Sequence, residues 1–265
     1  GLLRRDGAAA FYTGDIARAI VAKSDALGGS MTRGDLEGYR GHWVEPIAVS
    51  YKGHEIAELP PPSQGWAALE MLNILEACVP AWAPGETLAT LGPRSPRYWH
   101  FLVEAKKLAY ADLFAFNADP AFAPLPLDRL LSKAYAASLC RRVDPARATN
   151  TRRGSADASG DTVVLSTADA EGNIVAMVNS VASVWGSGLT VGDCGFVLHN
   201  RGVQFSLDPQ SRNIIAPGKR PFNTLAAGFV LHQGAPLMSL LLMGGDMQSQ
   251  GHAQALVNIL DLGAN

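Results

Sequence analysis

Residues 160–180 read GDTVVLSTADAEGNIVAMVNS, and the prediction of the fold starts from this stretch. From Val163 to Thr167, successive side chains would point to opposite faces of a strand, as β-geometry requires. Residues 169–172 are turn-forming, and a second β-branched run begins at Ile174. The stretch therefore predicts a β-hairpin with Thr162 at its start.

The position of Thr162 suggests a chemical use. Residues 149–160 before it are rich in Ser, Ala, Arg and Asp, a composition typical of an exposed loop that could be cut. Cleavage between Asp161 and Thr162 would leave a free α-amine, with a pKa of roughly 7.7–8.0, beside the threonine hydroxyl. That amine can accept the hydroxyl proton and activate the nucleophile. Threonines that start strands without any catalytic role are also common.

Composition limits the classes of protein that fit. The chain has 265 residues and 48% hydrophobic content, enough for one large domain or two small ones. A net charge of −2, with 17% charged residues, favours neither a nucleic-acid partner nor a polybasic membrane contact. No apolar run has the length of a membrane span. The odd set Cys78, Cys140 and Cys194 lacks metal-ligand spacing and predicts buried or free thiols rather than a disulfide framework.

Hydrophobic periodicity predicts a mostly helical first part and a strand-rich second part. Thr32 and Asp35 have capping-box spacing at the start of a short helix, and Ser63 is expected to cap the helix that begins at Trp66. The expected helices are 15–26, 32–39, 66–78, 95–115, 128–141 and 250–260. The expected strands are a hairpin over 45–59 and single strands at 163–168, 173–179, 194–199, 225–231 and 237–243. This order predicts a layered α+β or α/β sandwich.

Several motifs, in order along the chain, are similar to those of one family. Residues 160–180 resemble the start of the small subunit of the gamma-glutamyltranspeptidases, which are N-terminal nucleophile hydrolases. The similarity continues through residues 185–188, 200–202, 205–209, 217–221 and 243–248. The last of these segments look most like the transpeptidase-like and acylase-like branch of the family. Upstream, residues 11–17, 60–65 and 104–112 resemble the later part of the large subunit.

The resemblance implies a four-layer αββα sandwich with the hairpin at the centre of one sheet. It also implies that residues 1–161 are the C-terminal part of a large subunit and 162–265 a small subunit, so that the chain is a fragment of a longer precursor. Self-cleavage would then give a heterodimer of the two products, and further dimerisation of this heterodimer stays open. The family pattern implies no cofactor and no metal, and the cellular compartment stays open.

The resemblance also assigns the catalytic groups. Thr162 is the expected nucleophile, and Ser180 is the second hydroxyl that hydrogen-bonds it. The backbone N–H groups of Gly244 and Gly245 are expected to form the oxyanion hole, where glycine permits close approach of the backbone. Taken alone, a Gly-Gly pair is usually a turn and Ser180 could merely satisfy a strand end.

Substrate-binding positions follow the family less closely. Asn223 and Thr224 lie where two hydroxyl residues bind the substrate carboxylate. Transpeptidases receive the glutamyl ammonium with an Asn, a Gln or Glu, and an Asp, but Ala182, Arg201 and Gln204 lie at the matching positions. Arginine is an obligate cation and cannot accept a hydrogen bond from an ammonium.

Arg201 therefore favours an acyl group that carries a carboxylate, such as glutaryl, unless its side chain faces solvent or pairs with Asp193 or Asp208. The first hypothesis is a self-processing gamma-glutamyltranspeptidase-like enzyme acting on a small amide such as a glutathione-like molecule. The second is an acylase for glutaryl or cephalosporin-type amides. The third is an uncleaved scaffold without activity.

Overall fold

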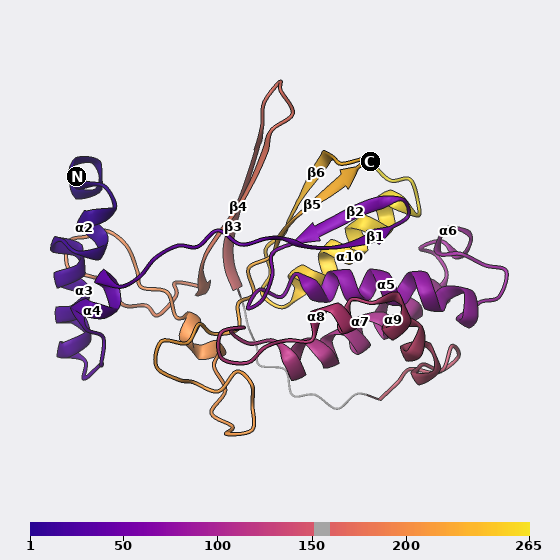
Figure 1. The fold of residues 1–265 in the computed structure, drawn as a ribbon, viewed down its shortest axis with the longest axis horizontal. Helices are drawn as coiled ribbons and strands as arrows, with labels where there is room; N and C mark the ends of the chain where they lie inside the picture. Colours follow the sequence, from indigo (N-terminus) through magenta and orange to yellow (C-terminus); the bar gives the residue numbers. More distant parts are fainter. Residues whose placement is uncertain (151–159) are drawn as a thin grey trace.

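A computed structural model describes residues 1–150 and 160–265, except for the side chains of residues 160 and 161 (Figure 1). Most of the exposed loop predicted before Thr162 lies outside this described part. The chain begins with four short helices, α1 (Leu2–Asp6), α2 (Ala8–Tyr12), α3 (Asp15–Ala26) and α4 (Arg33–Glu37). They stand apart from the main body and reach it through an extended segment (Figure 1). The predicted capping box, Thr32 with Asp35, is present at the start of α4.

The main sheet contains four antiparallel strands in the order β1-β2-β5-β6. Strands β1 (Ile47–Tyr51) and β2 (His54–Glu58) form the expected hairpin, and strands β5 (Ala227–His232) and β6 (Ala235–Leu241) form another. Lys52 and Gly53 both have positive φ, 50° and 79°, as a two-residue hairpin turn requires. Because β2 pairs with β5, with Ile56 opposite Val230, the sheet combines segments from before and after Thr162.

Helices α5 (Trp66–Trp82) and α10 (Met247–Leu260) pack together and against the sheet. Helix α7 (Pro96–Phe116) and helix α9 (Lys133–Leu139) pack against α5 (Figure 1). Short helices α6 (Leu88–Leu91), α8 (Leu127–Leu130) and η1 (Cys140–Arg142) complete this helical layer. Helix α5 is buried around most of its circumference, as its nearly continuous apolar sequence predicts. The core therefore lies between the sheet and α5.

The predicted hairpin of residues 160–180 is confirmed as β3 (Gly160–Ala168) and β4 (Ile174–Ser183). It forms a separate two-stranded sheet that projects beside β6 (Figure 1). The Oγ atoms of Ser166 on β3 and Ser239 on β6 lie 2.8 Å apart in a hydrogen bond. Val163, Leu165 and Met177 on one face of the hairpin remain about half exposed or more. The described residues thus show a hairpin joined to the main sheet by side chains.

Three local predictions were wrong. Ser63 does not cap α5, because Gly65 is the residue before that helix and the Ser63 hydroxyl donates to the Leu225 carbonyl. The single helix expected over 128–141 is divided, because Ser132 caps a new helix at α9. The strand expected at 194–199 is absent, since its one ladder contact is the isolated bridge between Thr190 and Val197.

Segment 191–198 packs on the N-terminal helices instead of joining a sheet. Val191 forms a small buried cluster with Ala10, Ile16 and Ile20, and Phe196 and Leu198 pack against that cluster. The alternating apolar residues that predict a strand here are explained by this contact. The N-terminal helices are consequently attached to residues that follow Thr162 in the chain.

The expectation of free thiols was wrong for two of the three cysteines. Cys78 near the end of α5 and Cys140 in η1 form a disulfide, with Cα atoms 5.1 Å apart and a sequence separation of 62. Packing of α9 on α5 brings them together, which spacing alone could not predict. Cys194 is free.

The α+β class is confirmed, while the four-layer sandwich remains a prediction. The division predicted at residue 161 also remains a prediction. It would be a cleavage point within one folded unit, because one sheet contains strands from both sides of it. Within residues 1–150 and 160–265, no helix has the length and apolarity needed to cross a membrane.

A buried pair of acids lies in the helical layer. Glu70 of α5 is fully buried, and within the described structure neither of its carboxylate oxygens meets an N–H or O–H donor. Burial, and then the charge and the hydrogen bond of Asp112, raise the pKa of Glu70 well above its ordinary value. Asp112 also accepts a 2.6 Å hydrogen bond from the Tyr135 hydroxyl. A protonated Glu70 can donate to Asp112, whereas an ionised one cannot.

The Glu70→Gln variant should therefore become more stable relative to the wild-type protein as pH rises. The folded state holds the Glu70 proton above pH 4.5, the ordinary value, so wild type loses stability between that pH and the higher folded pKa. Glutamine cannot ionise, and the variant should lose this fall in Tm across the same window.

Glu104→Gln is the control with the opposite sign. Burial raises the pKa of Glu104, but hydrogen bonds from Lys107 and Thr149 outweigh burial and lower it. A Tm difference between wild type and Glu70→Gln that does not change with pH would contradict the assignment.

Candidate active site

The hairpin places the two predicted hydroxyl groups side by side. Thr162 on β3 lies opposite Ser180 on β4, and the Thr162 hydroxyl donates to Ser180 Oγ over 3.2 Å. Ser180 Oγ also accepts from the backbone N–H of Ala182 at 2.9 Å. Thr162 is 5% exposed, so its hydroxyl is held in one environment. The expected pairing of residues 162 and 180 is confirmed as a geometry, and their catalytic role stays a prediction.

The backbone is irregular at the bond that precedes Thr162. Asp161 lies opposite Ala182 while Thr162 lies opposite Ser180, so the register shifts and Val181 has no partner in the ladder. Ala182 has φ of 79°, an uncommon conformation for a residue with a Cβ. Bulges of this kind change the aim of neighbouring groups and are frequent beside active sites.

Asn200 joins the end of the hairpin to the next site element. Its side chain exchanges two hydrogen bonds with Ser183, from the Ser183 N–H at 3.0 Å and to the Ser183 Oγ at 2.9 Å. Its backbone N–H donates to the Val181 carbonyl at 3.1 Å. The short helix η2 (Arg201–Gln204) follows directly, so Arg201 lies next to the hairpin end. Sequence reasoning quoted Asn200 within a motif but gave it no role.

Arg201 is a buried cation whose guanidinium has one hydrogen-bond partner among the described residues. It is 8% exposed, and its Nη1 donates to the Thr224 hydroxyl at 2.6 Å. Its Nη2 is buried without a hydrogen-bond acceptor among the described residues. No described ion pair joins Arg201 to Asp193 or Asp208, so neither alternative partner is seen. Burial lowers the pKa of Arg201, yet a guanidinium stays protonated in proteins.

His199 lies beside Arg201 as a neutral imidazole. Its Nδ1 accepts a hydrogen bond from the Arg201 backbone N–H at 3.1 Å, which requires the unprotonated form of that nitrogen. Burial and the charge of Arg201 lower the pKa of His199. The neutral imidazole therefore presents its remaining N–H at Nε2.

The other predicted substrate-binding residues differ in their placement. Thr224 is buried against Arg201, and Asn223 is fixed at the start of the same loop because its backbone N–H donates to the Pro62 carbonyl at 2.9 Å. The Asn223 side-chain oxygen accepts from the Leu225 N–H. Within the described part of the chain, the Gln204 side chain has no hydrogen bond to these groups. The structure thus brings Arg201 and Thr224 together and leaves Gln204 aside.

Gly244 and Gly245 lie between β6 and α10, as predicted. Both have positive φ, 132° and 58°. Their carbonyls accept from the N–H groups of Met247 and Gln248 in the first turn of α10. A Cβ at Gly244 would come 2.9 Å from the Met247 Cε atom. The geometry requires glycine here, and the oxyanion role stays a prediction.

Gln64 connects the carboxylate loop to the glycine pair. Its fully buried side-chain amide donates to the Thr224 carbonyl at 2.6 Å and to the Gly245 carbonyl at 2.7 Å. Sequence reasoning missed this residue, although its motif, residues 60–65, was part of the resemblance. The run Ser63-Gln64-Gly65 before a buried helix was the available signal.

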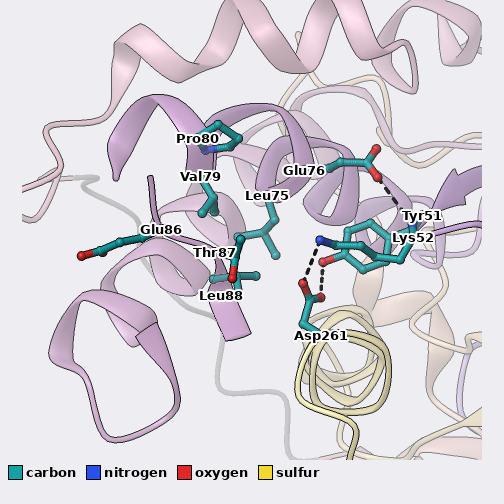
Figure 2. A pocket seen from close by; sticks show the side chains of 10 residues that line it. All are labelled: Tyr51, Lys52, Leu75, Glu76, Val79, Pro80, Glu86, Thr87, Leu88 and Asp261. Carbon is teal, nitrogen blue, oxygen red and sulfur yellow. Dashed lines mark hydrogen bonds and ion pairs between the residues drawn. The ribbon is translucent and has the colours of Figure 1, made fainter. Parts of the chain in front are cut away.

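A small cavity of about 60 Å³ lies elsewhere (Figure 2). It is lined in part by Asp261, which pairs with Lys52 at 3.2 Å and accepts from the Tyr51 hydroxyl at 2.6 Å (Figure 2). Asp261 follows the C-terminal end of α10, whereas the glycine pair precedes its N-terminal end. A 14-residue helix is about 21 Å long, so this cavity is not the candidate site. Among the described residues, no group of three His, Cys, Asp or Glu side chains could hold a metal.

The family model described as gamma-glutamyltranspeptidase matches residues 1–265. The chain belongs to this family. A relative called glutathione hydrolase-like YwrD proenzyme, from Bacillus subtilis (strain 168), is 36% identical to this gamma-glutamyltranspeptidase family member, over 99% of this chain and 48% of that protein. The acylase ACY 1 proenzyme of Pseudomonas sp. (strain SE83) is 35% identical, over 98% of this chain and 46% of that protein.

The same family likeness extends to three dimensions. The crystal structure of cephalosporin acylase from Bacillus halodurans matches with a TM-score of 0.88 and 35% identity, covering 99% of this chain and 46% of that chain. The chain spans about half the length of the curated relatives it matches.

Ser180→Ala tests the hydroxyl pair in the full-length protein. Removing the group that bonds Thr162 should slow cleavage after Asp161 about tenfold, the factor that corresponds to a hydrogen bond of about 1.4 kcal/mol. Intact mass recorded over time gives the rate. Ser166→Ala is the matched control, because it removes a hydrogen bond on the same hairpin but away from Thr162. Equal rates in the two variants would contradict a role for Ser180.

Proposed function

We propose that the full-length protein is a self-processing amidohydrolase in which Thr162 is the nucleophile. The Thr162–Ser180 hydrogen bond, the low exposure of Thr162 and the bulge beside the preceding bond support this role. The family relatives carry the word proenzyme in their names, which fits processing by cleavage.

The chemistry uses one hydroxyl twice. In the precursor, Thr162 Oγ attacks the Asp161 carbonyl carbon, the acyl group moves from nitrogen to oxygen, and water hydrolyses the ester. The shift frees the Thr162 amine, and the hydrolysis releases the Asp161 carboxylate and restores the Thr162 hydroxyl. In turnover, that amine takes the hydroxyl proton while Oγ attacks the substrate amide carbon, and the proton leaves with the departing amine. Water then hydrolyses the acyl-enzyme, with Gly244 and Gly245 N–H groups stabilising the oxyanion.

The two products of cleavage would remain together as a heterodimer. Strands β1 and β2 lie before Thr162, β5 and β6 lie after it, and β2 pairs with β5 through four residue pairs. Helix α10 packs on α5 across the same boundary. Loss of one peptide bond at residue 161 leaves these contacts intact. Further association of heterodimers stays an open expectation.

The substrate class is proposed from Arg201. A buried guanidinium without a charged partner is costly, and a carboxylate is the group that best satisfies its free N–H donors. Among the described residues Arg201 has the Thr224 hydroxyl as its side-chain partner and a buried, unsatisfied Nη2. We infer an amide substrate whose acyl group ends in a carboxylate, as in glutaryl or cephalosporin-type amides. This single observation favours the acylase hypothesis over gamma-glutamyl transfer, in which an ammonium would approach the same place.

Cleavage is the first test. The full-length wild-type protein should split between Asp161 and Thr162, and Thr162→Ala should stay whole, as read by intact mass after incubation. If the wild-type protein also stays whole, Thr162 lacks its amine and the silent-scaffold hypothesis replaces the enzyme.

Substrate competition is the second test. Glutaryl anilide should be turned over with higher kcat/KM than gamma-glutamyl anilide, and Arg201→Leu should lower the glutaryl value about 10- to 100-fold through lost charge-assisted hydrogen bonds. Arg212→Leu, which removes an exposed arginine bonded to the Pro124 carbonyl, is the matched control. Far better turnover of gamma-glutamyl anilide by the wild-type protein would overturn the role given to Arg201.

A further inference from the structure

Gln64 donates both N–H groups of its amide to two separate parts of the candidate site. One goes to the Thr224 carbonyl at 2.6 Å and the other to the Gly245 carbonyl at 2.7 Å, both closer than the usual 2.9 Å or so of an N–H···O bond. The flipped amide would place its oxygen against two carbonyl acceptors, so these two contacts fix the position of the amide nitrogen.

Each of the two carbonyls belongs to a residue next to the proposed chemistry. Thr224 holds Arg201 through its hydroxyl, and its carbonyl is held by Gln64. Gly245 supplies an N–H to the proposed oxyanion hole, and its own carbonyl is held by the same amide. Gln64 thus connects the group that would bind the substrate carboxylate to the group that would stabilise the reacting carbonyl.

The turn that carries Gln64 is itself fixed on several sides. The Ser63 hydroxyl donates to the Leu225 carbonyl at 2.6 Å, and the Ser249 hydroxyl of α10 donates to the Gln64 carbonyl at 2.7 Å. A Cβ on Gly65 would come 2.5 Å from Glu58 Oε2. Glu58 in turn bonds His252 of α10 at 2.6 Å, where both side chains are buried. The turn that carries the amide is therefore bonded both to the loop that contains Thr224 and to α10, which follows the glycine pair.

We propose that Gln64 is a positioning residue that sets the separation between the Arg201–Thr224 carboxylate site and the Gly244–Gly245 oxyanion site. The inference rests on the proposed function, and it adds a determinant of acyl-chain length. A substrate must span from the scissile carbonyl to its carboxylate across a distance that the Gln64 amide holds constant. Small misplacements of such groups are sufficient to lower rates strongly.

The chain offers a matched control in Asn73. This residue is also a fully buried amide, and its Nδ2 donates to the Leu131 carbonyl at 2.8 Å, within the helical layer. Asn73→Leu removes a buried amide without touching the site. Gln64→Met removes both donors while keeping a side chain of similar length. Comparison of the two separates lost stability from lost positioning.

The experiment uses the full-length protein and measures cleavage rate, kcat, KM and Tm with anilides of succinate, glutarate and adipate. Gln64→Met should slow cleavage and kcat roughly 10- to 100-fold and weaken the preference among the three chain lengths. Asn73→Leu should lower Tm while kcat and chain-length preference stay at wild-type values. If Gln64→Met lowers Tm but keeps the wild-type rates and preference, Gln64 is structural and the inference is overturned.

Gln64→Glu decides the case if Gln64→Met does not fold. A neutral carboxyl can donate one of the two hydrogen bonds, whereas a carboxylate faces two carbonyls and donates none. Cleavage by Gln64→Glu, divided by wild-type cleavage at each pH, should rise as pH falls, and a constant ratio would overturn the inference. Absence of cleavage in the wild-type protein is a different outcome, since it removes the proposed function itself.

Discussion

The pairing of β2 with β5 is the contact on which the rest of the structure depends. It joins two hairpins that are separated by more than 160 residues of sequence, with Glu55 opposite Leu231 at one end and Glu58 opposite Gly228 at the other. Once these strands pair, α5 and α10 follow them onto the sheet, and the loops that precede both helices meet at one end. The candidate site is built at that meeting point, from loops whose positions the sheet determines.

Several buried polar groups gather at this end of the core. Glu58 and His252 form a buried pair, Gln64 bridges two loops, and Arg201 enters from η2. Burial of such groups costs free energy unless each is hydrogen-bonded. Each group nevertheless keeps one buried atom without a partner among the described residues. These atoms are Glu58 Oε2, Gln64 Oε1, His252 Nε2 and Arg201 Nη2, of which the Arg201 atom belongs to an obligate cation. The absence of an anionic partner for Arg201 among the described residues fits the proposal that a substrate carboxylate binds there.

The elements that sequence predicted well are those governed by local rules. Alternation predicted the hairpin, the family resemblance predicted the pair Thr162 and Ser180, and capping-box spacing predicted the start of α4. The errors arose where distant contacts override local pattern. Phe196 and Leu198 alternate like a strand but pack on helices, and Ser63 has cap chemistry but bonds a distant carbonyl. The Cys78–Cys140 disulfide and the two bonds of the Gln64 amide depend on tertiary packing that no spacing reveals.

The N-terminal helices provide a second contact between the residues before and after the predicted cleavage point at residue 161. They precede Thr162 in the chain, yet their buried residues pack on Val191, which follows it. The two segments therefore grip one another at two places, the shared sheet and this helical cluster. The contacts between the two segments are the same whether the peptide bond at residue 161 is intact or cleaved. Cleavage at residue 161 would create a new N-terminus at Thr162, and the noncovalent contacts on both sides of that terminus would continue to hold the two products together.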